Sequence, residues 1–397
     1  MSVDETVEAK PRRRGSRAVF GTVIAVVVLL LFGVPWATLV WSGNAWPAPV
    51  FIAGTALFLL VAAGFPVLML RGHGGHSDAA ARAADVLLGV VWVLFTWSVI
   101  GQAAGLLLAL AGVADPMRSR AVTAGVLVIS AVLLVWGYAE AMRVSRVRNV
   151  EVTLPRLGPG LDGLRVVLIT DTHYGPIDRS RWSRGVVDVI NSLDPDIVAH
   201  TGDIADGQVA QRLSQSAPLG DVRAKYARVY VTGNHEYFSG ALGWVEHMTS
   251  LGWDALHNRH LLVSRNGDSL IVAGVDDRTA AGSGLPGHHA DHAAALAGAD
   301  PSLPVLLLAH QPQQITGAVD HGIDLQLSGH THGGQMWPFH YLVRIDQPVL
   351  QGLSRHSDRT QLYTSRGTGF WGPPFRIFAP SEITLLTLRT PTPTPTS

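Results

Sequence analysis

The stretch Arg165-Val-Val-Leu-Ile-Thr-Asp171-Thr-His173 decides the fold, because in it an apolar run leads straight into a polar motif. A nearly continuous apolar run is typical of a strand that is buried on both faces of a sheet. Further short motifs rich in Asp, Asn and His follow along the chain, nearly all of them after apolar runs of the same kind. They are Gly202-Asp203-Ile-Ala-Asp206, Gly233-Asn234-His235-Glu236, His310 and Gly329-His330-Thr-His332-Gly-Gly-Gln335.

Short β-rich runs alternate with helix candidates around these motifs. The expected strands cover 165–170, 197–201, 229–232, 270–275, 305–309, 325–328, 361–365 and 383–388. The expected helices cover 181–193, 243–251 and 289–296. Strands interleaved with helices predict an α/β fold, an αββα sandwich with the sheets in the centre and the helices outside. Since the carboxyl ends of strands in such sheets line a common crevice, we expect the motifs to converge there.

The N-terminal third of the chain has a different composition. The whole chain is 47% hydrophobic and only 15% charged, and no charged side chain occurs within 18–70, 86–114 or 121–139. A bilayer core needs about 20 apolar residues as a helix, so these stretches predict transmembrane spans. We expect four transmembrane helices, near 18–41, 48–70, 86–110 and 121–139, with a tight turn at Ser42–Pro47. A cleaved signal peptide is the alternative for the first, and the further spans argue against it.

The expected organisation is therefore a basic N-terminal tail (1–17), four transmembrane helices (18–140), a linker (141–160), a soluble domain (161–389) and a disordered tail (390–397). From residue 141 onward there are 21 Lys and Arg against 23 Asp and Glu, without a basic block, so nucleic acid is a poor partner. Cys is absent, which excludes disulfides, thiolate metal sites and Cys nucleophiles. The sequence does not indicate an oligomeric state.

The motifs carry the side chains that bind divalent metals. Carboxylate, amide and imidazole ligands at one crevice can hold two such ions close together, an arrangement suited to splitting phosphate esters. Each motif alone is a weak signal, because Asp-Thr-His or Gly-Asn-His after a strand is often only a turn. The Gly-His-Thr-His segment at Gly329–His332 is stronger, since two imidazoles in a glycine-framed loop have few structural uses. All five motifs in this order favour the metal site.

Residues 161–388 resemble the calcineurin-like metallophosphoesterase family, and all five family motifs are intact. The Gly-His-Thr-His-Gly-Gly-Gln version is similar to the family's bacterial membrane-associated branch. The resemblance implies two divalent metal ions, Mn, Fe or Zn. Four residues would bind the first ion: Asp171, His173, Asp203 and His332. The second ion would share Asp203 and add Asn234, His310 and His330.

The same resemblance implies roles for three neighbouring side chains. His235 would act on the substrate as proton donor or charge stabiliser, and Asp206 would orient its imidazole and favour the charged form. Glu236 stands where some members have Asp, and we expect it to support the ligands rather than bind metal. Asn234 has a competing structural role as the cap of a helix that begins at His235.

The remaining polar and aromatic candidates have simpler explanations. We expect His200 to point into packing, and His257 and His260 to flank Asn258 in a turn. A third set invites a further metal site, but we expect exposed loop residues there: His288, His289 and His292. Asp276 and Asp277 could line the crevice without touching metal. Four aromatic residues could form an apolar rim near the site or the bilayer, or could equally belong to the core: Trp337, Phe339, Phe370 and Trp371.

The favoured function is a membrane-anchored dimetal phosphoesterase. It would hydrolyse a phosphomonoester, a phosphodiester or a pyrophosphate, including a lipid-linked one, through a metal-bridging hydroxide. One alternative is a transporter or channel that the soluble domain regulates, although transport sites usually need ionisable residues within the spans, and these have none. Another is a catalytically inactive binding module.

The charges that flank the spans predict the orientation. Positive residues next to spans stay cytoplasmic. The tail offers five of them, Lys10, Arg12, Arg13, Arg14 and Arg17, whereas Ser42–Pro47 has none. Three more follow the fourth span: Arg143, Arg146 and Arg148. An even number of spans from a cytoplasmic start predicts an integral protein of the cell membrane with a cytoplasmic catalytic domain.

Overall fold

A computed structural model describes residues 14–75 and 77–391, and the chain within it divides into two units. One unit comprises the stretches up to Leu70 and Leu87–Leu133, and the other comprises Arg71–Val86 and the chain from Leu134 on. Most of the predicted basic tail and of the predicted disordered tail lies outside the described residues.

Four helices account for the predicted spans. They are α1 (Arg14–Trp36, continued by a π-helical turn Ala37–Trp41), α2 (Ala48–Met69, continued by Leu70–Gly74), α3 (Asp78–Leu110) and α4 (Met117–Met142). All four are long and apolar enough to cross a membrane. Helices α3 and α4 extend beyond the predicted spans because hydropathy marks only the apolar part of a helix, and both continue into charged residues.

Several polar side chains of the four-helix unit make hydrogen bonds within it. The Gln102 amide donates to the Thr38 hydroxyl at 2.9 Å, and that hydroxyl donates to the Val34 carbonyl at 3.0 Å. The Thr123 hydroxyl donates to the Thr38 carbonyl at 3.0 Å. Because lipid offers no hydrogen bonds, such pairs hold helices together. The hydrogen bond to Thr38 thus accounts for the presence of the polar Gln102 in an apolar helix.

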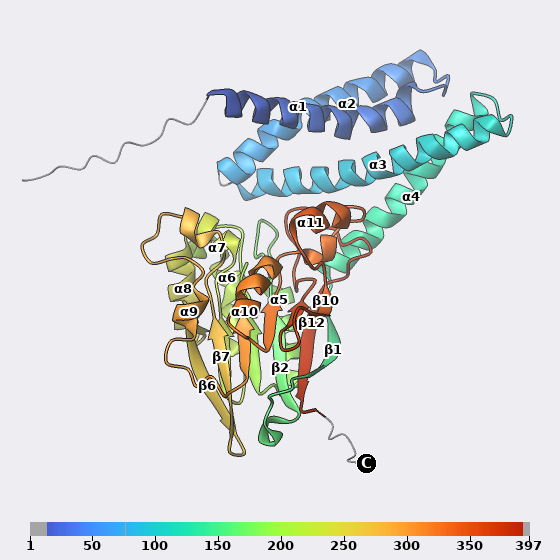
Figure 1. Ribbon diagram of the computed structural model, residues 1–397. Coiled ribbons are helices and arrows are strands. Elements are labelled where there is room, and N and C mark those ends of the chain that lie inside the picture. Colours follow the sequence, from blue (N-terminus) through green and yellow to red (C-terminus); the bar gives the residue numbers. More distant parts are fainter. Residues whose placement is uncertain (1–13, 76, 392–397) are drawn as a thin grey trace, which may run out of the picture. The chain divides into compact units, whose positions relative to one another are not determined.

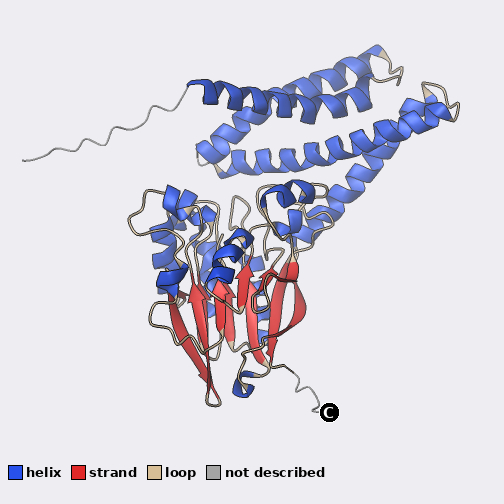
Figure 2. Ribbon diagram, in the orientation of Figure 1, coloured by secondary structure: helices blue, strands red, loops and turns tan. Residues whose placement is uncertain are grey.

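Two six-stranded sheets form the centre of the second unit, and its strands are drawn red in Figure 2. The first sheet has the order β1-β12-β2-β3-β4-β5, with bounds Arg146–Thr153, Glu382–Arg389, Leu164–Ile169, Ile197–His200, Ala227–Tyr230 and Asp254–Ala255. The second has the order β10-β11-β9-β8-β7-β6, with bounds Gly352–Arg355, Gln361–Thr364, Leu325–Ser328, Val305–Leu308, Asp268–Gly274 and Arg259–Arg265. The motif-bearing strands β2, β3 and β4 run parallel to one another, as do β8 and β9.

Alternate residues of the strands face opposite layers. In β2, Val166 and Leu168 pack into the cluster between the two sheets, whereas Val167 and Ile169 face the helices on the outer side. In β8, Leu306 packs between the sheets and Leu307 packs against the helices of the other outer layer. The period of two along each strand therefore produces the αββα sandwich that the sequence predicts.

Seven α-helices cover these sheets or lie at their ends (Figure 1). Their bounds are α5 Ser180–Ser192, α6 Val209–Ser216, α7 Asn234–Ser239, α8 Ala241–Ser250, α9 His292–Ala295, α10 Ile315–Asp320 and α11 His340–Asp346. Helices α5 and α8 lie close to their predicted positions, while α9 is a single turn. The others are too short to show a helical period in the sequence.

The first sheet begins earlier than expected. Strand β1 lies within the stretch assigned to a linker, and it pairs in parallel with β12, Arg146 opposite Glu382 and Val152 opposite Leu388. Val152 is fully buried. The sequence around it mixes Arg, Asn and Glu with single apolar residues, which is the pattern of an edge strand. Strand β1 forms by pairing with β12, which is distant in the sequence. The domain therefore begins before residue 161.

Candidate metal centre

The polar motifs occupy the turns that end strands β2, β3, β4, β8 and β9. Five of their side chains belong to residues with positive φ, between 41° and 69°: Asp171, His173, Asp203, His330 and His332. Residues other than Gly rarely adopt this conformation, and its strain concentrates at functional sites. The sharp turns direct the polar side chains into one crevice, which confirms that the motifs converge.

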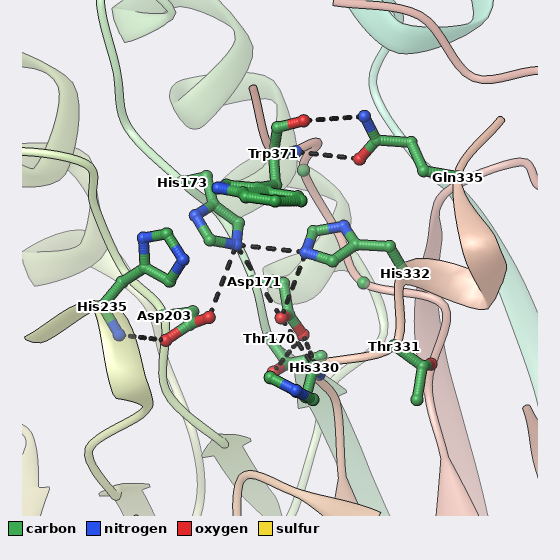
Figure 3. Close-up of polar contacts among 12 residues, drawn as sticks. Thr170, Asp171, His173, Asp203, His235, His330, Thr331, His332, Gln335 and Trp371 are labelled. Atoms are coloured by element: carbon green, nitrogen blue, oxygen red, sulfur yellow. Dashed lines mark hydrogen bonds and ion pairs between the residues drawn. The ribbon is translucent and has the colours of Figure 1, made fainter. Parts of the chain in front are cut away.

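Three predicted ligands form a first group (Figure 3). The Nε2 atoms of His173 and His332 lie 3.1 Å apart, and Asp171 Oδ1 lies 3.3 Å from His332 Nε2 and 3.8 Å from His173 Nε2. Asp171 is fully buried, and its carboxylate accepts the Thr170 hydroxyl at 2.7 Å. The donor atoms therefore face one another around a single point.

A second group lies beside the first. His310 Nε2 is 3.1 Å from Asn234 Oδ1, 3.1 Å from Asp203 Oδ2 and 3.2 Å from His330 Nδ1. His310 is fully buried, and its other ring nitrogen bonds to the Thr201 carbonyl at 2.8 Å, which fixes the orientation of the ring. Such a bond on the second nitrogen is typical of imidazoles that bind metal.

Asp203 belongs to both groups. Its Oδ2 lies 3.1 Å from His310 Nε2 and 3.6 Å from His173 Nε2, so one carboxylate separates the two sets of imidazoles. Burial would raise the pKa of Asp203, but the neighbouring His310 and His235 imidazoles outweigh burial and hold the pKa below its ordinary value. The carboxylate is therefore ionised and available to two cations.

The imidazoles fit a metal centre electrostatically. Burial lowers the pKa of His332 and of His330 to about 4, so both imidazoles are neutral, which is the form of histidine that binds metal. Burial would also lower the pKa of His310, but the Asp203 carboxylate raises it to about 10. A positive charge is thus favoured beside the Asp203 carboxylate. Closely opposed nitrogen lone pairs, carboxylates and an amide oxygen are a donor set that fits two divalent ions.

His235 and Asp206 lie at the edge of the first group. The Asp206 Oδ1 atom is 2.6 Å from His235 Nδ1 and 3.1 Å from His173 Nδ1, so it contacts two imidazoles. The second contact was not apparent from the sequence. Burial would lower the pKa of His235, but Asp203 and Asp206 outweigh burial and raise it. His235 is therefore poised to carry a proton.

Glu236 supports the ligands more strongly than the sequence indicates. Its fully buried carboxylate accepts three backbone N–H groups, from Gly233 at 2.6 Å, Ile204 at 2.7 Å and Asp203 at 2.9 Å. Burial and the Asp203 charge raise the pKa of Glu236 to about 7. This side chain joins the turn after β3 to the turn after β4.

Arg376 and Gln335 hold the C-terminal side of the crevice. The fully buried Arg376 guanidinium donates to the His332 carbonyl at 2.9 Å and lies 3.1 Å from His332 Nδ1. The Gln335 amide exchanges two hydrogen bonds with the Trp371 backbone, at 2.7 and 2.9 Å (Figure 3). Arg376 follows no recognisable motif, so its role could not be predicted from the sequence.

The other histidines differ in their surroundings. His200 is fully buried against the rings of Tyr230 and Trp253, as expected. Only one of the three loop histidines, His289, is exposed, because His288 and His292 are partly covered. Contrary to the predicted turn, His260 lies within strand β6.

The aromatic candidates divide between rim and core. Phe370 is 6% exposed and packs under the Arg179 guanidinium, so it belongs to the interior. Trp371 and Phe339 are 47% and 36% exposed, and Trp337 is partly buried. The ring of Trp371 lies 6.1 Å from that of His235, so this residue forms part of a rim beside the candidate centre.

Comparison with known proteins relates this chain to a protein family. A family model described as calcineurin-like phosphoesterase matches residues 164–334. A transmembrane protein with metallophosphoesterase domain from Danio rerio is 40% identical over 270 residues, which cover 66% of this chain and 62% of that protein. Its Bos taurus namesake is 36% identical over 271 residues, 66% of this chain and 61% of the relative, so the match spans less than two thirds of either. An uncharacterized metallophosphoesterase of Campylobacter jejuni is 30% identical over 328 residues, 81% of this chain and 85% of that protein.

Replacing Asp203 should remove both bound ions. In Asp203→Asn we expect loss of metal and a fall in hydrolysis of at least about 100-fold, because changes in supporting residues alone cost about 10–100-fold. Elemental analysis and turnover of a chromogenic phosphodiester measure the two effects. Two ions per chain and an unchanged rate would contradict a shared Asp203.

Removing the Glu236 carboxylate should loosen the crevice. Glu236→Ala leaves three backbone N–H groups without their acceptor, and each such loss costs about 1–3 kcal/mol. We expect destabilisation of roughly 3 kcal/mol or more together with weaker metal binding. Thermal unfolding and metal content are the measurements, and Glu246→Ala, an exposed position on α8, is the matched control. Equal behaviour of the two variants would rule out this supporting role.

Proposed function

The chain belongs to the calcineurin-like metallophosphoesterase family, and we propose that it is a membrane-anchored dimetal phosphoesterase acting on a phosphate ester or pyrophosphate whose other end is apolar. The observation that carries the proposal is the position of Asp203 between two groups of metal-binding side chains. In this proposal Asp171, His173, Asp203 and His332 hold one ion, and Asp203, Asn234, His310 and His330 hold the other.

Two divalent cations, when bound, supply an activated water and neutralise charge on the phosphoryl oxygens. The chain supplies the positioning. Asp203 and Asn234 stand at the ends of neighbouring strands, and buried hydrogen bonds hold both His310 and Asp171 in place. The ligands therefore need little rearrangement before reaction, which lowers the cost of reaching the transition state.

His235 is the proposed proton donor to the leaving group. Its Nδ1 bonds to Asp206 Oδ1 at 2.6 Å, so the proton to be transferred lies on Nε2. The raised pKa of His235 favours the protonated ring. After transfer the neutral ring takes a proton from solvent, which the Asp206 carboxylate favours, and the donor is restored.

The surroundings of His235 favour a substrate with an apolar part. Phe238 is 72% exposed and Trp371 is 47% exposed, and their rings lie 5.6 Å and 6.1 Å from the His235 ring. Large exposed aromatic side chains beside a polar centre are typical of a surface that binds an apolar group. A membrane anchor would supply such substrates from the bilayer, so a lipid-linked phosphate is the proposed class.

A comparison of paired substrates tests this function. The full chain in detergent, loaded with Mn²⁺, is assayed on a short-chain and a long-chain phosphodiester that share a leaving group. We expect hydrolysis of both and a lower KM for the long-chain ester. Absence of hydrolysis in every metal-loaded form would refute the enzyme, and equal KM values would refute the apolar preference.

Replacing His235 should slow the reaction without removing the metals. For His235→Ala we expect a loss of about 10²–10⁴-fold, the usual contribution of a general acid, and near-normal metal content. The loss should shrink for esters with good leaving groups, which need no proton. His289→Ala, an exposed imidazole away from the ligands, is the control. An equal loss for good and poor leaving groups would exclude proton donation.

We further propose that the catalytic domain faces the cytoplasm. Four spans that start among the positive residues of the N-terminal tail return the chain to the side on which it began. A reporter that folds only outside the cytoplasm, fused after Ser397, should be inactive, and a cytoplasmic reporter at the same point should be active. Strong activity of the first reporter would invert the topology.

A further inference from the structure

A second cluster of metal-binding side chains lies around the end of strand β7 and includes none of the seven proposed ligands above. Three separate segments contribute to it. His257 comes from the turn between β5 and β6, Asp276 from the end of β7 and His288 from the long connection before α9. None of these residues belongs to a motif of the phosphoesterase centre.

The two imidazoles each face one oxygen of the same carboxylate. His257 Nδ1 is 2.7 Å from Asp276 Oδ1, and His288 Nδ1 is 3.5 Å from Asp276 Oδ2. The two rings lie 4.4 Å apart with their planes 32° from parallel. One nitrogen or oxygen atom from each residue lies within 4.8 Å of the others, so the three can reach one ion.

The Asp276 carboxylate is incompletely satisfied by the protein. The residue is 2% exposed, and its buried Oδ2 has no hydrogen-bond partner. His288 stands nearest to this oxygen without making a hydrogen bond. A buried carboxylate oxygen without a partner is costly, and a native structure usually supplies a proton, a water or an ion. The orphaned oxygen is therefore a sign of a ligand, independent of the clustering of the histidines.

We propose that His257, Asp276 and His288 bind one further divalent cation of the Zn²⁺ type. Two imidazoles and a carboxylate are a common ligand set for Zn²⁺ and leave a fourth position for water. The His257 side chain is 44% exposed, so the ion exchanges with solvent, while His288 and Asp276 hold it from the interior. The ion satisfies Asp276 Oδ2 and links the three segments.

The residues next to this site bond to neighbours other than the seven proposed ligands of the paired-metal centre. Asp277, the next residue, bonds to the Gln311 amide at 2.9 and 3.1 Å. Tyr237, two residues after His235, places its hydroxyl 3.1 Å from His288 Nδ1 and 3.1 Å from the Thr232 hydroxyl. When the cation takes His288 Nδ1, Tyr237 retains Thr232. The ion thus stabilises the connection 276–292 beside α7 without contacting the catalytic ligands.

Counting ions tests the proposal without relying on activity. The full chain in detergent is stripped with chelator, reloaded with Zn²⁺, freed of excess by gel filtration and analysed for metal per chain. We expect three ions in the wild type and two in the double variant His257→Ala, His288→Ala. His289→Ala, exposed and next to the site, should retain three. Two ions in the wild type, or three in the double variant, would overturn the proposal.

Two further variants separate this site from the proposed function. Asp276→Asn keeps the size of the side chain and should also lose one ion, so it replaces the double variant if that chain fails to fold. Asp203→Asn should lose the paired ions and keep the third. An Asp203→Asn chain without any Zn²⁺ would refute the third site, whereas a failure of hydrolysis alone would leave it standing.

Discussion

The carboxylate of Asp203 is the group on which the candidate metal centre depends. Its Oδ2 lies between His173 and His310, and its Oδ1 accepts the backbone N–H of His235 at 2.8 Å. One side chain thus joins two sets of ligands and fixes the start of α7. Asp203 has a positive φ, which is unfavourable for a residue other than Gly. The surrounding contacts must therefore stabilise this backbone conformation.

Those contacts offset the free-energy cost of the unfavourable backbone conformations in the crevice. A non-Gly residue in this conformation costs on the order of 1–3 kcal/mol, and the crevice contains several of them beside buried charges. Glu236 satisfies three N–H groups below the crevice, and Arg376 satisfies the backbone beside His332. The apolar core between the sheets stabilises the strands. The buried hydrogen bonds of Glu236 and Arg376 then fix the turns that follow the strands. The stability of the fold and the geometry of the candidate metal centre therefore depend on different residues of the same strands.

The two units of the chain differ in the side chains that they contain. The apolar parts of the four helices contain no ionisable side chain, and Gln102 is satisfied by Thr38. Transport usually requires ionisable groups within the spans. In contrast, the second unit gathers carboxylates and imidazoles in one crevice with an aromatic rim. The chain belongs to a family of metallophosphoesterases, and among its relatives are proteins named for transmembrane segments.

The sequence by itself determined the αββα architecture, the four apolar helices and the residues that meet in the crevice. It could do so because burial of strands and helices leaves local periods, and because parallel strand ends meet at one edge. Only the tertiary structure decided that β1 joins β12, that Arg376 supports His332, and that Asp276 lies between His257 and His288. Each of these contacts joins segments distant in sequence, and packing, which leaves no local pattern, brings them together.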